Sequence, residues 1–134
     1  MKTLNQYLAI EHYNALSFVF PKLNLENIKV KFVEKDGKSG FLAFISSTFF
    51  KPTTTIKLDK ADWEENRLID PFHSYEGLIL CHELIHCEQT LSFWNRVIMR
   101  LANFFIEYED RWHEKEAHTN APILLEKWKG LING

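Results

Sequence analysis

The stretch "GLILCHELIHCEQT", residues 77–90, constrains this chain more than any other part of its sequence. Leucine, isoleucine and cysteine surround His82, Glu83 and His86, which is typical of a helix that is buried on most sides. Histidines four residues apart lie on one helical face, so both imidazoles can bind one metal ion. Buried without a metal or a hydrogen-bonding partner, the same histidines would destabilise the fold. We therefore interpret this stretch as a helix that carries a metal-binding pair.

Glu83 adds a reactive group to the predicted pair. It follows His82 directly, so its carboxylate is expected beside the ion rather than bound to it. A carboxylate in that place can take a proton from a water molecule that attacks a carbonyl carbon. The same five-residue pattern also arises by chance in unrelated chains, so its helical context is what supports the interpretation.

The third protein ligand has to come from another part of the chain, because a catalytic zinc ion usually has three protein ligands and one water. The metzincin spacing would need glycine and histidine where the chain has Gln89 and Ser92, so that class is excluded. Farther on, the segment 105–125 has polar residues at helical spacing, namely Glu109, His113, Glu116 and Asn120. Alone, such a stripe is typical of a solvated face. Paired with the upstream motif, it predicts that Glu116, His113 or Glu109 completes the site.

Hydrolysis of a carbonyl compound also needs a donor for the oxyanion that develops. His113 is our first candidate for this catalytic role, and Tyr108, Tyr75 and His73 are alternatives. The tyrosines also fit the core or its rim, and His73 fits a loop. Gln89 lies one turn after His86 and could hold a ligand or the substrate, although a surface glutamine fits as well.

The remaining pattern predicts an α+β fold in one domain over residues 1–134. We expect an N-terminal helix at residues 3–18, then a three-stranded β-meander with strands at 27–34, 41–50 and 53–58, the last at the edge. A short helix at 59–68 and a loop should precede the helix with the two histidines, which Asp70 or Ser74 could cap. The rest of the chain reads as helical.

Composition and charge indicate which partners and which compartment to expect for the protein. The formal net charge is −2 and the basic residues are scattered, which does not favour a nucleic-acid partner. The N-terminus lacks the uninterrupted apolar core of a secretory signal, and four polar residues interrupt the apolar stretch 91–107, so we expect no membrane span. Cys81 and Cys87 would point from different helical faces and read as reduced thiols. Together these features predict a cytoplasmic protein.

With these motifs in view, the chain resembles the gluzincin metallopeptidases, the thermolysin-like division of the zincins, over roughly residues 27–129. The resemblance is to small bacterial and phage zincin-like domains, in which an HExxHxxQ stretch is followed by a Glu-x-Glu-Ala segment. Here "HELIHCEQ" and "EKEA" match these motifs. The resemblance implies a zincin-like fold and a zinc-dependent peptidase that cleaves a peptide or protein substrate.

Carried onto this sequence, the resemblance implies that His82, His86 and Glu116 bind Zn²⁺ and that Glu83 is the general base. Asn120 would stand where gluzincins often place an aspartate that orients a histidine ligand. With His113 as third ligand, the site would instead resemble the three-histidine site of SprT-type proteases.

Two further expectations concern the substrate and the rival function. In zincins the strand beside the active-site helix typically binds an extended substrate, a role open here to residues 53–58 or 41–47. A chain this short lacks a second domain to complete a cleft, so a protein partner could complete it. The rival interpretation is a zincin-fold binding or effector module that keeps the metal and acts by contact, against which the intact Glu83 argues.

Overall fold

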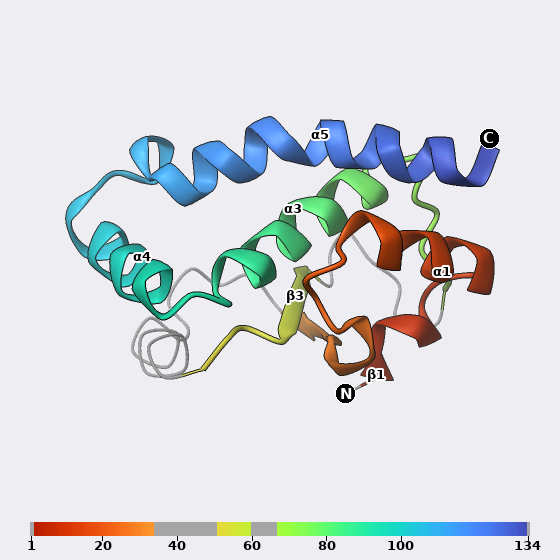
Figure 1. The fold of residues 1–134 in the computed structure, drawn as a ribbon, viewed down its shortest axis with the longest axis horizontal. Coiled ribbons are helices and arrows are strands. Elements are labelled where there is room, and N and C mark those ends of the chain that lie inside the picture. The colour runs from red at the N-terminus through yellow and green to blue at the C-terminus, as the bar shows by residue number, and fades with distance from the viewer. Residues whose placement is uncertain (1, 34–50, 60–66, 134) are drawn as a thin grey trace.

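The computed structural model describes residues 2–33, 51–59 and 67–133, and these residues form an α+β structure with a small sheet and four helices (Figure 1). In chain order the elements are β1 (Lys2–Thr3), a 3₁₀ turn (Leu4–Gln6), α1 (Ile10–Val19), a 3₁₀ turn (Leu25–Asn27), β2 (Lys29–Val33), β3 (Thr55–Asp59), α3 (Glu76–Gln89), α4 (Phe93–Phe105), a 3₁₀ turn (Tyr108–Asp110) and α5 (Trp112–Asn133). The predicted α+β class is confirmed. Within the described ranges, no helix is both long and apolar enough to cross a membrane.

The sheet is mixed and has the strand order β1-β2-β3. β1 pairs antiparallel with β2, and β2 pairs parallel with β3 in a register that sets Val30 opposite Ile56. Val30, Ile56 and Leu58 are buried while Lys29 and Lys57 are exposed, so the period-two alternation correctly predicted two of the strands.

The predicted β-meander is wrong, because β2 and β3 hydrogen-bond to each other directly and leave no place for a strand between them. Adjacent parallel strands are joined by a crossover rather than a hairpin, and alternation shows which face of a strand is buried but not which strand is its neighbour. The predicted strand at 41–50 lies outside the described residues, as does most of the short helix predicted at 59–68.

The first helix starts later than the predicted residue 3. Lys2 and Thr3 instead pair with β2, and the amide of Leu4 donates to the carbonyl of Ile28 at 2.9 Å. The side chain of Gln6 then accepts from the amide of Thr3 at 2.9 Å and stabilises the 3₁₀ turn. Apolar residues at helical spacing predicted burial here correctly, but strand pairing satisfies the first backbone groups.

Helix α3 lies at the centre of the structure, and it packs mainly along α5 (Figure 1). Its first turn approaches the preceding loop closely, since a Cβ on Gly77 would overlap the carbonyl oxygen of Pro71. Tyr75 is the residue at the N-cap, yet the hydroxyl of Ser74 accepts from the amide of Glu76 at 3.2 Å, so Ser74 does help to cap this helix. The carboxylate of Glu76 also accepts from the amide of Asp70 at 2.7 Å.

Trp128 joins the C-terminal part of α5 to α1. Its side chain is fully buried, and its indole nitrogen donates to the backbone oxygen of His12 at 2.9 Å. The indole also packs edge-on against Phe72, with ring centroids 5.2 Å apart. One side chain thereby holds α1, the loop before α3, and α5 together.

We predict that Trp128→Ala lowers the free energy of unfolding by about 3–5 kcal/mol, because it leaves a cavity and removes the hydrogen bond to the backbone oxygen of His12. The measurement is urea unfolding of the metal-free protein followed by circular dichroism. Trp94→Ala is the matched control, since Trp94 is 70% exposed and its loss should change stability by less than about 0.5 kcal/mol. Equal losses in the two variants would contradict the role assigned to Trp128.

Candidate metal centre

Three side chains from two helices converge where the first turn of α5 lies against α3. The Nε2 atoms of His82 and His86 lie 3.1 Å apart, and Oε1 of Glu114 lies 3.4 Å from the first and 2.5 Å from the second. Glu114 is buried, and both histidines are partly buried. The group could hold a metal ion.

The spacing of these three atoms fits a small metal ion. Ligands bound to zinc at 2.0–2.1 Å in a tetrahedron are separated from one another by about 3.3 Å. Two of the three separations, 3.1 and 3.4 Å, lie close to that value, and the third, 2.5 Å, is shorter. The predicted pairing of His82 with His86 on one helical face is therefore present in the structure.

Gln89 determines which nitrogen of His86 faces Glu114. The amide nitrogen of Gln89 donates to the backbone oxygen of His113 at 3.0 Å and to the carboxylate of Glu116 at 3.1 Å. Its amide oxygen therefore faces Nδ1 of His86, 2.8 Å away, and accepts a hydrogen bond from it. With the proton on Nδ1, Nε2 of a neutral His86 presents a lone pair to the site, as a metal ligand must.

The ionisation of His86 and Glu114 favours a cation shared between them. Burial opposes the charged form of His86, but the hydrogen bond and the charge of Glu114 outweigh burial and raise the pKa of His86. Burial likewise opposes the charged form of Glu114, yet hydrogen bonds from His82, His86 and Tyr108 hold the pKa of its carboxyl well below the ordinary value. A carboxylate that stays charged between two imidazoles suits a metal ion, which can replace the proton held there.

The structure brings Glu114, rather than the predicted Glu116, to the two histidines. Glu116 is exposed and accepts from Gln89 instead, so it supports the site from outside. The prediction assumed that one helix runs through the whole polar stripe, but α5 begins only at Trp112 and Glu109 lies in the preceding 3₁₀ turn. Glu114, and not Glu116, therefore completes the group that could hold a metal ion.

The sequence did contain a signal for Glu114. Ala117 and Ala121 follow it at spacings of three and seven residues, and all three side chains are buried on the face of α5 that meets α3. Small residues at helical spacing allow two helices to approach closely, so an acidic residue in phase with them can reach the neighbouring helix.

His113 does not join the three converging side chains. It is 4% exposed, its ring lies 5.9 Å from that of His86, and its Nδ1 has no hydrogen-bond partner among the described residues. Burial lowers the pKa of His113 to about 4, so the imidazole is neutral at neutral pH. Its predicted catalytic role stays a prediction.

The other candidate donors for the oxyanion differ in their distance from the site. Tyr108 interacts with the site, because burial together with the effect of Glu114 raises the pKa of its phenol. The negative charge of Glu83 also raises the pKa values of Tyr108 and His86. His73 instead pairs with Asp70 in the loop before α3, and Tyr75 is 80% exposed at the N-cap.

The two cysteines flank the two histidines in the sequence but do not belong to the group of His82, His86 and Glu114. Cys81 and Cys87 are buried and form no disulfide. Burial raises the pKa of each thiol to about 12, so both remain protonated at neutral pH. They fill space in the core as small apolar side chains.

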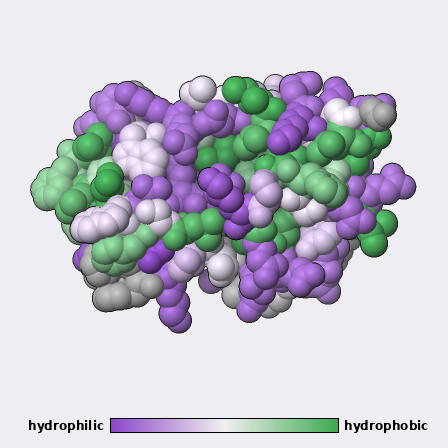
Figure 2. All heavy atoms as spheres, viewed as in Figure 1, coloured by the Kyte–Doolittle hydropathy of each residue, from purple (hydrophilic) through white to green (hydrophobic). Residues whose placement is uncertain are grey.

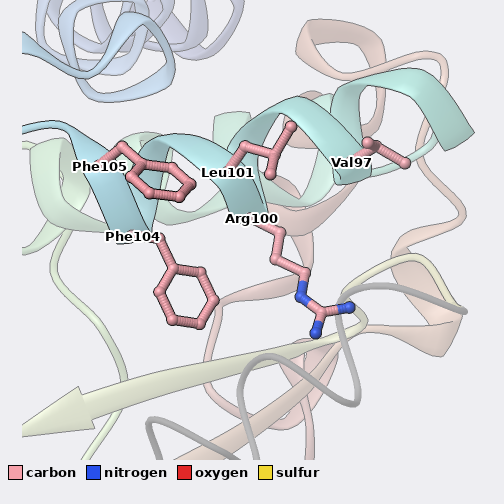
Figure 3. A pocket seen from close by; sticks show the side chains of 5 residues that line it. All are labelled: Val97, Arg100, Leu101, Phe104 and Phe105. Carbon is pink, nitrogen blue, oxygen red and sulfur yellow. The ribbon is translucent and has the colours of Figure 1, made fainter.

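A hollow of about 340 Å³ lies elsewhere, on α4, and is lined by Val97, Arg100, Leu101, Phe104 and Phe105 (Figure 3). Apolar side chains of this helix also cover the surface at that end of the molecule (Figure 2). The hollow has none of the three converging side chains in its lining, so its apolar character does not bear on the chemistry at Glu114.

No protein-family model, curated protein or solved structure matches this chain. Its function is therefore inferred from the geometry of the site.

We predict that Glu114→Gln weakens zinc binding by more than about a hundredfold, because losing a charged ligand exceeds the effect of losing a supporting hydrogen bond. Glu116→Gln is the matched control and should bind zinc nearly as the wild type does, since its amide oxygen can still accept from Gln89. Zinc affinity is measured by competition with a chromophoric chelator. The reverse order of the two variants would restore Glu116 as the third ligand.

We also predict that Gln89→Leu weakens zinc binding by about 10- to 100-fold, since Nδ1 of His86 loses the acceptor that fixes its tautomer. Gln89→Glu retains an acceptor there but, like Gln89→Leu, loses the donor to the backbone of His113. An affinity preserved in the glutamate variant alone would show that orientation of His86 is the cause. Equal losses in both variants would assign the effect to the helix contact instead.

Proposed function

We propose that this protein is a zinc-dependent peptidase of the gluzincin type, with a zincin-like fold, in which His82, His86 and Glu114 hold the ion. The observation that carries the proposal is the triangle of their three ligand atoms, with Glu83 next to His82 on the same helix. Two imidazoles and one carboxylate are a ligand set of catalytic zinc sites, which leaves the fourth position for water.

When bound, zinc supplies a Lewis acid that polarises the scissile carbonyl and makes water acidic enough to attack at neutral pH. Glu83 accepts the proton of the attacking water and delivers it to the nitrogen of the departing amine, so that the peptide bond breaks as the new carbon–oxygen bond forms. A structural metal site has no use for this carboxylate.

The arrangement of the elements supports a peptide as the substrate. β3 is the outer strand of the sheet that the described residues form, and α3, which carries Glu83, lies against it. An extended peptide can add to an outer strand of a sheet by backbone hydrogen bonds. The substrate would then run along β3, beside α3.

We predict that Glu83→Gln lowers the rate of peptide cleavage by about 10²- to 10⁴-fold while zinc binding is retained, because the amide cannot accept the proton. The measurement combines zinc content with cleavage of a diverse peptide library followed by mass spectrometry. Glu88→Gln is the matched control, as Glu88 is a partly buried acidic residue of the same helix with no part in the triangle. A wild type that binds zinc but cleaves nothing beyond what Glu83→Gln cleaves would refute the peptidase proposal and leave a structural metal.

A further inference from the structure

A third histidine lies beside the triangle and has no role so far. His118 stands one helical turn after Glu114 on α5, and its side chain is exposed. Its ring centroid lies 4.7 Å from that of His82, with the ring planes inclined at 56°. The pair Glu114 and His118 on α5 thus faces the pair His82 and His86 on α3, each pair with the four-residue spacing that places two side chains on one helical face.

The separation of the rings allows a shared ion once the side chain of His118 turns, because its ring nitrogens lie outside the group of ligand atoms that come within 4.8 Å of one another. Two imidazoles bound to one tetrahedral zinc at 2.0–2.1 Å have ring centroids about 5 Å apart. The ligand pair His82 and His86 shows 4.7 Å, and His82 with His118 shows the same 4.7 Å. His113 lies farther from the nearest ligand, with its ring 5.9 Å from that of His86, and is buried rather than exposed.

We propose that His118 is a fourth protein ligand, so that the ion is held in a closed set of three histidines and Glu114 in the absence of substrate. This inference rests on the metal site of the proposed function and specifies its resting state. The exposed side chain of His118 has the rotamer freedom to leave the ion, whereas the more buried ligands do not. Departure of His118 opens the position that water needs for hydrolysis.

The test uses the full chain stripped of metal, with Co²⁺ as a spectroscopic probe and Zn²⁺ in competition for affinity. In the wild type we expect the intense visible absorption of four-coordinate Co²⁺. His118→Ala and His118→Gln should weaken zinc binding by about tenfold or more, and their Co²⁺ absorption should fall as water molecules enter the coordination sphere. His73→Ala, which removes an exposed histidine that pairs with Asp70 in the loop before α3, is the matched control and should match the wild type in both measurements.

The possible results separate this inference from the proposed function, because neither measurement involves a substrate. If both His118 variants retain the affinity and the spectrum of the wild type while His82→Ala loses the metal, the fourth ligand is refuted and the three-ligand site stands. If His82→Ala also binds like the wild type, the ion is not at this site and both proposals fail. Circular dichroism of each variant is used to check that the fold is intact.

Discussion

The contact between α3 and α5 is the interaction on which the rest of this structure depends. Buried apolar side chains of α3 meet Ala117 and Ala121 of α5, and these small residues let the helices approach closely. Gln89 crosses the same contact with two donated hydrogen bonds and one accepted bond. The helix contact therefore fixes the phase of α5 relative to α3, and that phase decides which carboxylate reaches the histidines.

The same contact explains why a charged group can be tolerated between two helices. Isolated in a low-dielectric interior, the carboxylate of Glu114 would be strongly destabilising. Here two imidazoles face it and lower the pKa of its carboxyl, so it remains ionised in spite of burial. A polar cluster of this kind contributes less to stability than well-packed apolar side chains would. Its presence at the α3–α5 contact therefore supports the proposed metal site.

The sequence predicted the parts of the site that depend on local spacing and missed the parts that depend on tertiary contacts. His82 and His86 belong to one helix, so a rule about four-residue spacing was sufficient to pair them. Glu114 belongs to another helix, and the contact between α3 and α5 determines which face of α5 meets the histidines. Likewise, alternation predicted β2 and β3 as strands, but their parallel pairing and the pairing of Lys2 and Thr3 with β2 involve partners distant along the chain.

The side chains of the site project from two helices rather than from loops. Each helix fixes the spacing of its own two polar residues, so only the relation between α3 and α5 remains to be set, and Gln89 with the alanines sets it. Such rigidity keeps ligands in place before the ion arrives, which favours binding. The proposed hydrolysis additionally requires one coordination position to open. In a site whose other members are wholly or largely buried, the group that can open it is the one at the solvent edge, and His118 occupies that edge.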